Sequence, residues 1–412
     1  MSSFDEAKQR YAEQGVDVDA ALATLGKTRI SMQCWQGDDV KGFDNQELSG
    51  GIAATGSYPY AARNKEELMS DIKKAYSLIP GKHKLNLHAS YLIAEGKVDR
   101  DQIEPKHFQA WVDFAKEQGI GLDFNPTLFG HPKANVSGTL SSPDKSIRDY
   151  WIEHSKRSRE IAAYFGKELG MTSLNNIWIA DGFKDVPASR IGPRQRLKDS
   201  LDEIFAKKYD KKYLADSVEG KVFGIGLESC TVGSHEFYTN YAAKNNIICL
   251  LDTGHYHPLE YVSDKISAYL LFNERVALHV SRSVRWDSDH VIKLDDELKE
   301  LARELVNCDA LERTFIGLDF FDASINRVAA WVIGMRNMQK ALLLALLAPN
   351  ARLTAYQDKL DFTALLASFE NERSLPWGAV WDKFCEMNNV PTDDKWYAEV
   401  LKYEKDVLSQ RK

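Results

Sequence analysis

The sequence predicts an α/β fold in which eight βα units close into a barrel. Eight short apolar segments with strand character follow one another along the 412-residue chain, and longer helical patterns separate them. This alternation favours parallel pairing, because the connection between two parallel strands needs about a dozen residues or more. No linker rich in Pro, Gly or Ser divides the chain, so we expect one (β/α)8 TIM barrel rather than separate domains.

The expected strands are short runs of alternating or β-branched apolar residues. They cover residues 29–35, 84–90, 120–125, 175–180, 247–252, 276–280 and 314–319, and one weakly marked strand ends near Lys221. The helical patterns between them include residues 66–78, 106–118, 147–169, 195–207, 295–306 and 324–347.

The eight units are complete by residue 349. We therefore expect residues 1–349 to form the catalytic barrel, with a short N-terminal helical extension before Lys27. Residues 350–412 carry no strand signal and contain helical patterns such as FTALLASF and WGAVWDKFCEM. We expect this C-terminal helical extension to pack on the barrel or on a neighbouring subunit.

Composition excludes several classes of protein. The chain has 53 Lys and Arg against 60 Asp and Glu, a formal charge of −7, and no block of basic residues, which argues against a nucleic-acid partner. No apolar run approaches the ~20 residues of a membrane span, and the first residues do not resemble a signal peptide, so we expect a cytoplasmic protein. The five cysteines are scattered without a CxxC pair, which disfavours disulfide or thiolate–zinc frameworks.

Acidic residues and histidines gather at the ends of the later strands, where such barrels place their chemistry. Side chains two residues apart on a strand face the same way, so Glu219 and Lys221 could both point into the barrel mouth. The remaining candidates follow the sixth, seventh and eighth strands and are Asp252, His255, His279, Asp287, Asp289 and Asp319.

Each candidate has an ordinary structural explanation when taken alone. His279 could be a hydrogen-bonded core residue, Asp287 and Asp289 could form a turn, and Asp319 could cap a helix. Together, however, the carboxylates would repel one another strongly in a single cleft unless cations bind there. A pair of divalent metals resolves this repulsion, and ligands without thiolate favour Mn²⁺, Mg²⁺ or Co²⁺ over a structural zinc.

Long segments of the sequence resemble L-rhamnose isomerases. The resemblance extends over nearly the whole chain and is carried by RISMQCWQGDDVKGFD, LNLHASY, NIWIADG, FGIGLES, TVGSHEFY, DTGHYHP, LHVSRSVRWDSDHV and GLDFFDASINRVAAWVIGMRNMQKALL. More distantly, the E-x-K, D-x-x-H, His, D-x-D and Asp series is similar to the metal ligands of xylose isomerases.

The resemblance implies two metal sites, with Mn²⁺ as the expected metal and Zn²⁺, Co²⁺ or Mg²⁺ as alternatives. The implied ligands of a structural metal are Glu219, Asp252, His279 and Asp319. Those of a catalytic metal are His255, Asp287 and Asp289, with Asp252 or a water close by. The resemblance also implies catalytic roles for Lys221, His88 and Asp319, and apolar substrate-binding walls made by Trp178, Trp35 and Phe321.

Two of these assignments have alternatives. Glu228 ends a more strand-like run than Glu219, although the E-x-K spacing favours Glu219. His257 could replace His255, although the D-x-x-H spacing favours His255. We expect the remaining histidines in helical or charged segments to be surface residues: His83, His107, His154 and His235.

The implied reaction is the interconversion of L-rhamnose and L-rhamnulose in rhamnose catabolism by a metal-assisted 1,2-hydride shift. The implied assembly is a homotetramer. The long connection over residues 42–64 is a candidate lid or subunit contact.

A different aldose isomerase, or a metal-dependent hydrolase or endonuclease on the same barrel, would share these ligands. A hydrolase or endonuclease would also need phosphate-binding basic residues, of which only Arg282, Arg285 and Lys221 are near. A non-catalytic sugar-binding protein would not need so many metal ligands.

Overall fold

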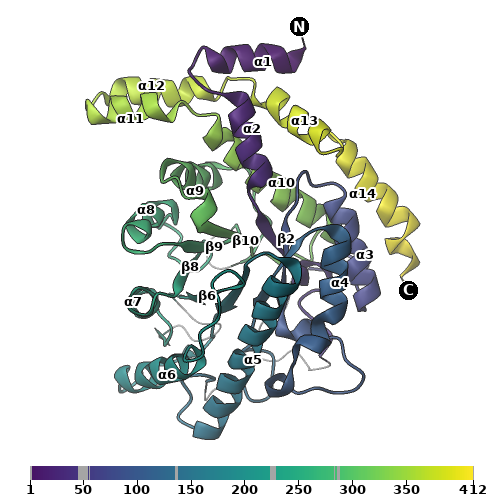
Figure 1. Cartoon of the computed structure of the whole chain (residues 1–412), viewed down its shortest axis with the longest axis vertical. Helices are drawn as coiled ribbons and strands as arrows, with labels where there is room; N and C mark the ends of the chain where they lie inside the picture. The colour runs from purple at the N-terminus through teal and green to yellow at the C-terminus, as the bar shows by residue number, and fades with distance from the viewer. Residues whose placement is uncertain are drawn as a thin grey trace.

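A closed barrel of eight parallel strands lies at the centre of the molecule, with helices around it (Figure 1). The structure is a computed structural model that describes residues 2–44, 54, 56–134, 138–222, 229–282, 284 and 288–411. The strand order is β1-β10-β9-β8-β6-β4-β3-β2, so the ring closes where β10 pairs with β1. The predicted (β/α)8 barrel is confirmed. Its strands are β1 (Ile30–Gln33), β2 (Lys84–His88), β3 (Gly121–Asn125), β4 (Ser173–Ile177), β6 (Leu214–Glu219), β8 (Ile248–Asp252), β9 (Val276–Val280) and β10 (Thr314–Leu318).

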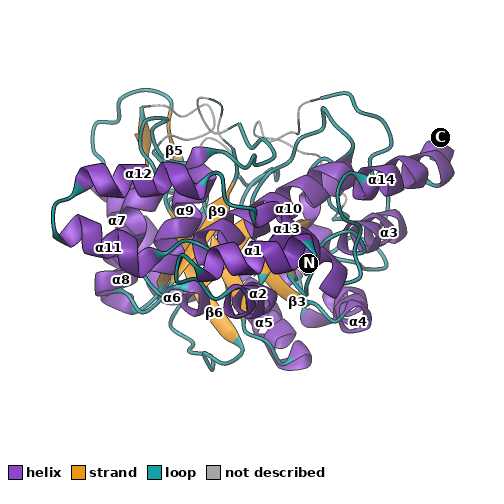
Figure 2. Ribbon diagram, turned by 90° about the horizontal axis from the view of Figure 1, so that it is seen from above, coloured by secondary structure: helices purple, strands orange, loops and turns teal. Residues whose placement is uncertain are grey.

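Helices connect these strands and form the outer wall of the barrel. They are α3 (Lys65–Tyr76), α4 (Gln109–Gln118), α5 (Lys145–Leu169), α6 (Ile191–Ile204), α7 (His235–Asn245), α8 (Ser263–Phe272), α9 (Asp296–Asn307) and α10 (Arg327–Leu346). A two-stranded antiparallel ribbon, β5 (Gly182–Phe183) with β7 (Cys230–Thr231), stands among the loops beyond the barrel strands (Figure 2).

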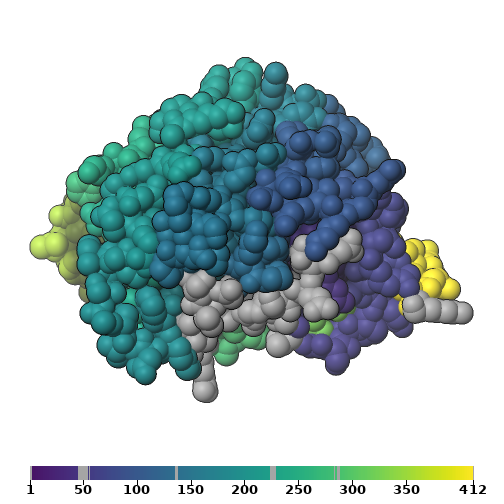
Figure 3. Space-filling view, turned by 90° about the horizontal axis from the view of Figure 1, so that it is seen from below, coloured from purple at the N-terminus to yellow at the C-terminus, as the bar shows by residue number. Residues whose placement is uncertain are grey.

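Further helices precede and follow the barrel. They are α1 (Ser3–Ala12), α2 (Val18–Lys27), α11 (Asn350–Asp358), α12 (Phe362–Glu372), α13 (Trp377–Met387) and α14 (Lys395–Asp406). The C-terminal segment lies against α3, as Figures 1 and 3 show. Arg411 forms a bidentate ion pair with buried Asp71 at 2.8 and 2.6 Å, and the Tyr403 hydroxyl donates to the same carboxylate at 2.9 Å. These contacts fix the end of the chain on the barrel wall.

Two predicted boundaries are wrong for identifiable reasons. We expected the fourth strand over residues 175–180, but β4 begins at Ser173, whose N–H donates to the Tyr213 carbonyl at 2.9 Å. We expected a helix over residues 195–207, but α6 starts at Ile191, because Gly192 and Pro193 fall in the first turn, where proline is tolerated.

The weak strand signal before Lys221 also has a physical cause. In β6 the outward-facing Asp216 is paired with Arg159 of α5 at 2.9 and 2.8 Å, so a charged residue stands where a strand normally carries an apolar one.

The lower interior of the barrel is a small apolar cluster beneath the strand ends. It comprises Leu174, Ala215, Leu250 and Ala277, with Ile248 and Phe315 packed against it. These residues precede Asn176, Glu219, Asp252 and His279 by two or four positions on the same strands, so both sets face the barrel axis. In the part of the chain that the structure describes, no helix combines the length and apolar character needed to span a membrane.

Candidate functional site

Four strands bring three carboxylates and one imidazole together at the carboxyl end of the barrel. Glu219 ends β6, Asp252 ends β8, His279 lies one residue before the end of β9, and Asp319 follows β10 directly. Asp252 and His279 are neighbours in the strand register. One ligand atom from each of the four side chains lies within 4.8 Å of the others, and all four residues are buried.

His279 stabilises this cluster electrostatically through its contacts with two of the carboxylates. Its Nδ1 lies 3.1 Å from Asp319 Oδ2 and 3.3 Å from Glu219 Oε2. Burial alone would lower the pKa of His279, but the two carboxylates hold it well above the ordinary histidine value. Burial would likewise raise the pKa of Glu219, but His279 and His255 hold it well below the ordinary value. Without a metal, a protonated His279 therefore supplies the positive charge that the carboxylates need.

The cluster fits a divalent cation. Nε2 of His279 and Oδ1 of Asp319 are buried and have no hydrogen-bond partner among the described residues. Buried polar atoms are normally paired, so these two atoms point to a ligand at this position. Carboxylate oxygens with an imidazole nitrogen suit Mn²⁺, Co²⁺ or Zn²⁺. The buried cluster could therefore hold a metal ion.

His255 joins the cluster from the loop after β8. Its Nδ1 lies 3.0 Å from Glu219 Oε1 and 3.2 Å from the Gly220 carbonyl oxygen, while its Nε2 lies 3.8 Å from Asp252 Oδ2. A carboxylate contact at one ring nitrogen is the usual arrangement for a histidine that binds metal through the other. The alternative, His257, is exposed and accepts the N–H of Leu259 at 3.2 Å, so the structure brings His255 rather than His257 to the site.

The other residues predicted for the catalytic metal are only partly described. Asp289 is half-buried, lines the same cavity as His255 and has a left-handed backbone, with φ 45°. Asp287 lies outside the described residues. Glu228, the alternative to Glu219, also lies outside them, whereas Glu219 is at the centre of the cluster.

A cavity with a volume of about 70 Å³ adjoins these side chains. Ten of the predicted site residues line it, and Asp252 contacts two of them, His255 and His279, at 3.8 Å. The ten are Glu219, His255, His279, Asp289, Asp319, Lys221, His88, Trp35, Trp178 and Phe321.

Aromatic rings form a continuous wall around the cavity. Trp35 stacks on His88 with ring centroids 4.2 Å apart, and Phe321 meets the edge of Trp35 at 5.4 Å. On the other side Phe129 bridges His88 and Trp178, with centroids 5.9 Å from each. Such a wall offers flat apolar surfaces to a bound ligand.

Two polar side chains interrupt this wall. Lys221 lies beyond the end of β6 with its Nζ 5.3 Å from the centre of the Trp178 ring. His88 ends β2, and burial, with a smaller contribution from the positive charge of His279, lowers its pKa to about 3. His88 is therefore a neutral imidazole at physiological pH.

The sequence analysis missed four residues of the cavity: Asn125, Pro126, Phe129 and Asn176. Asn176 donates to Glu219 Oε2 at 2.5 Å and accepts from the Ser217 hydroxyl at 2.8 Å, so it orients the central carboxylate. The alternation rule applied to Glu219 and Lys221 could have found it, because Asn176 precedes Trp178 by two positions. Phe129 follows its strand in a loop, and no sequence pattern marks it.

Two histidines expected at the surface are buried instead. His83 accepts the N–H of Ile30 at 3.3 Å and contacts the Pro80 carbonyl at 2.9 Å. His154 accepts the N–H of Thr127 at 3.0 Å and donates to the Arg100 carbonyl at 2.8 Å. Each satisfies buried backbone groups, which a helical or charged sequence context does not reveal.

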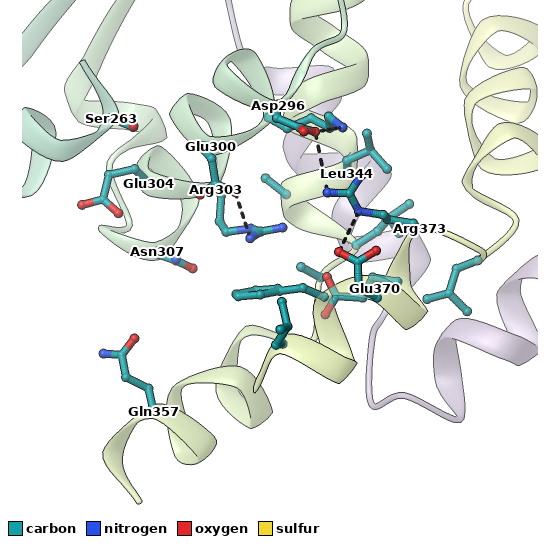
Figure 4. Close-up of a pocket in the computed structure, with 18 of the residues that line it drawn as sticks. Ser263, Asp296, Glu300, Arg303, Glu304, Asn307, Leu344, Gln357, Glu370 and Arg373 are labelled. Carbon is teal, nitrogen blue, oxygen red and sulfur yellow. Dashed lines mark hydrogen bonds and ion pairs between the residues drawn. The ribbon is translucent and has the colours of Figure 1, made fainter. Parts of the chain in front are cut away.

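A larger cavity, of about 630 Å³, lies outside the barrel between α8–α10 and α11–α12 (Figure 4). Its charged side chains pair with one another: Arg373 with Glu370 at 3.4 Å and with Asp296 at 3.8 Å, and Arg303 with Glu300 at 3.2 Å. None of the predicted site residues lines it. The chemistry therefore belongs to the smaller cavity.

Comparisons with curated proteins identify close relatives. The L-rhamnose isomerase of Listeria innocua serovar 6a is 58% identical over 410 residues, which cover 99% of this chain and 98% of the relative. The L-rhamnose isomerase of Mannheimia succiniciproducens is 56% identical over 413 residues, covering 100% and 99%.

Comparison with solved structures agrees with the fold. A D-allulose 3-epimerase from Methylomonas sp. has a TM-score of 0.50 at 12% identity, covering 76% of this chain and 98% of that chain. At this identity the likeness concerns the barrel alone. A family model described as L-rhamnose isomerase (RhaA) matches residues 1–411. With that match and the sequence identity to these relatives, the chain belongs to the L-rhamnose isomerase family.

Proposed function

We propose that this protein interconverts L-rhamnose and L-rhamnulose, in rhamnose catabolism, as a metal-dependent aldose–ketose isomerase. The observation that carries the proposal is the carboxylate–imidazole cluster opening into an aromatic-walled cavity that also holds Lys221 and His88. Membership of the L-rhamnose isomerase family supports the choice of sugar.

Two divalent ions, Mn²⁺ by preference, would be held by two groups of side chains. The first group is Glu219, Asp252, His279 and Asp319, and the second is His255 and Asp289 with Asp287. When bound, the ions supply Lewis acidity that polarises the sugar carbonyl. Glu219 serves both groups, because its two oxygens face His255 and His279.

The protein's own residues bind and orient the sugar. The Lys221 ammonium binds a sugar oxygen and offsets the negative charge of the carboxylates. His88 faces the sugar from the opposite, aromatic side, together with Trp35. Trp178, Phe129 and Phe321 cover the apolar face of a 6-deoxy sugar and exclude water.

The set of cavity residues favours direct transfer of hydrogen. The cavity-lining carboxylates of the described residues are Glu219, Asp289 and Asp319, and all three belong to the metal groups. No lone carboxylate is left there to remove a proton from carbon. The C2–H bond therefore breaks with its electron pair and forms a new C1–H bond, while the O2 proton moves to O1, so that the C1 aldehyde becomes a hydroxyl and C2 becomes the ketone.

Among the basic residues that a hydrolase or endonuclease would need, Arg282 is engaged outside the cavity. Arg282 donates its side chain to the Val291 carbonyl at 3.0 Å and its backbone pairs with His290. Arg285 lies outside the described residues. Lys221 is the one predicted basic residue that lines the cavity in the described structure.

Assay of L-rhamnose conversion tests the proposal. We expect ketose formation by the purified protein, its loss after exhaustive chelation and its return with Mn²⁺. A phosphodiester substrate assayed in parallel should remain intact. A protein that forms no ketose with any of Mn²⁺, Co²⁺, Zn²⁺ or Mg²⁺ would contradict the proposed function. Light scattering in solution would test the proposed homotetramer separately.

A further inference from the structure

One side of the barrel interior is polar, although the interior of such barrels is normally filled by branched apolar side chains. Lys84 and Asn86 of β2 and Asp123 and Asn125 of β3 are all buried. Lys84 Nζ is paired with Asp123 Oδ1 at 2.8 Å, and Asn125 Nδ2 donates to Asn86 Oδ1 at 3.1 Å. Burial of amide groups costs free energy even when they are partly paired. Asn86 and Asn125 are therefore less favourable than apolar side chains if their role is only to pack the barrel interior.

The upper end of this polar side reaches His88. His88 and Asn125 are partners in the register of β2 and β3, and Asn86 precedes His88 by two positions on the same strand. Asn125 Nδ2 lies 3.1 Å from His88 Nε2 as well as 3.1 Å from Asn86 Oδ1. An amide nitrogen carries two hydrogens and accepts none, so one hydrogen goes to Asn86 and the other to the ring nitrogen.

This contact determines where the ring carries its proton. A nitrogen that accepts a hydrogen bond has no proton of its own, so a neutral His88 is protonated on Nδ1. His88 Nδ1 is buried and has no hydrogen-bond partner among the described residues. The ring lines the cavity and is held in its plane by stacking on Trp35.

We propose that Asn125 is a positioning residue that fixes His88 in the Nδ1–H tautomer, so that this N–H donates a hydrogen bond to a sugar oxygen. The inference rests on the proposed function for the identity of the ligand. It makes His88 a donor to the substrate and excludes it as the base that removes a proton from carbon.

Asn125 alone would not fix the tautomer of His88, because its amide group could rotate, and Asn86 supplies the second contact that holds it. The Asn125 amide would present its oxygen to His88 if it rotated by half a turn, and the ring proton would then lie on Nε2. Asn86 opposes that rotation, because its Oδ1 accepts from Asn125 Nδ2 and would then face another oxygen.

Nitrogen NMR of the Mg²⁺-loaded enzyme, labelled with ¹⁵N-histidine, tests the tautomer without reference to activity. Mg²⁺ is diamagnetic, and the His88 signals are assigned by their loss in the His88→Gln variant. We expect a protonated, pyrrole-like Nδ1 and an unprotonated, pyridine-like Nε2. The opposite pattern, or a ring protonated on both nitrogens at neutral pH, overturns the inference.

The Asn125→Asp variant tests the consequence for catalysis. A carboxylate accepts only, so the His88 proton should move to Nε2 in the NMR spectrum, and kcat/KM for L-rhamnose should fall at least about 10-fold. In the His88→Gln background the same substitution should change kcat/KM less than about 3-fold, because Asn125 acts through His88. Equal losses in both backgrounds would show a purely structural role.

The wild-type measurements keep this inference separate from the proposed function. An enzyme that converts L-rhamnose but carries the proton on His88 Nε2 refutes the role of Asn125 alone. A protein with the expected tautomer but no conversion of L-rhamnose refutes the proposed function alone. If Asn125→Asp does not fold, Asn125→Ala takes its place, which removes the donor to Nε2 and should abolish the fixed Nδ1–H tautomer in the NMR spectrum.

Discussion

Nδ1 of His255 lies 3.0 Å from Oε1 of Glu219. The other oxygen of the same carboxylate lies 3.3 Å from His279, and Asn176 holds that oxygen in place at 2.5 Å. Glu219 is therefore shared between the four-residue cluster and the histidine assigned to the second metal. A change at Glu219 should affect both metals, as should a change at Asp252, whose Oδ2 lies 3.8 Å from both His255 and His279.

Replacement of Glu219 by Gln removes the charge and keeps the shape. We expect both metals to bind more weakly, by about 10- to 100-fold as for loss of a group that supports metal ligands. Metal content by plasma mass spectrometry after dialysis measures this. The matched control is Glu228→Gln, which should retain wild-type metal content. If Glu228→Gln loses metal and Glu219→Gln retains the wild-type metal content, Glu228 is the ligand and Glu219 is not.

The two groups of ligands should also differ in their effect on stability. Asp289→Asn should abolish turnover with little change in the melting temperature of the metal-free protein, because Asp289 is half-buried and asparagine tolerates its left-handed backbone. His279→Ala should lower that temperature by several degrees as well, because it leaves Glu219 and Asp319 as buried carboxylates without their cation, at a cost of about 3–5 kcal/mol. Calorimetry of both metal-free variants measures this difference. Equal melting temperatures would count against the assignment of His279 to the buried cluster and of Asp289 to the loop group.

Lys221→Met should reduce kcat/KM by about 10- to 100-fold, since a hydrogen bond from a charged group is worth about 1.5–3 kcal/mol. Metal content should not fall, because Lys221 is not a ligand. Steady-state kinetics and metal analysis on the same preparation measure both. Lys198→Met, which removes an exposed lysine paired with Asp202 on α6, serves as the control and should match the wild type. A loss of metal without loss of sugar binding would contradict this role.

Buried His154 should make the fold sensitive to mild acid. Burial lowers the pKa of His154 to about 3 from an ordinary value of 6.5. Because the folded-state value is depressed, the neutral ring contributes stability above pH 6.5, and this contribution is lost as the pH falls toward 3. Between pH 7.5 and 5 the loss is about 2 kcal/mol, at 1.36 kcal/mol per pKa unit.

Urea unfolding at several pH values checks this slope. The His154→Gln variant should be less stable at pH 7.5 but should lose less further stability on acidification than the wild type. His257→Gln, at an exposed position, should leave the slope unchanged. A wild-type slope retained in His154→Gln would assign the acid sensitivity to other groups.

The barrel could be predicted from the sequence because its strands are short apolar runs with clear intervals between them. The strand that carries Glu219 was the least visible, because Asp216 pairs with Arg159 and breaks its apolar pattern. Proposed ligands such as Asp252 and Asp319 stand directly at strand ends, so a strand predicted from the linear sequence also predicts their position.

Residues that act across strands were harder to predict. Asn125 contacts His88 and Asn86 through the sheet register, and Phe129 reaches the cavity from a loop. The surface positions expected for His83 and His154 are wrong because both residues bond backbone groups that are distant in sequence, such as those of Ile30 and Arg100. The division into a barrel over residues 1–349 and a helical extension over 350–412 stays a prediction, which separate expression of the two parts would test.

The isomerisation run in deuterated water tests the central claim most directly, because it follows the hydrogen that moves between C2 and C1. The enzyme loaded with Mn²⁺ converts L-rhamnose to low extent, the protein and metal are removed, and NMR of the ketose reports deuterium at C1. A hydride that passes directly from C2 to C1 never meets the solvent, so the account predicts L-rhamnulose without deuterium at C1. Substantial deuterium at C1 at early turnover would contradict it, since a proton removed by a base exchanges with water, and an enediol pathway with a metal-free base would then replace the hydride shift.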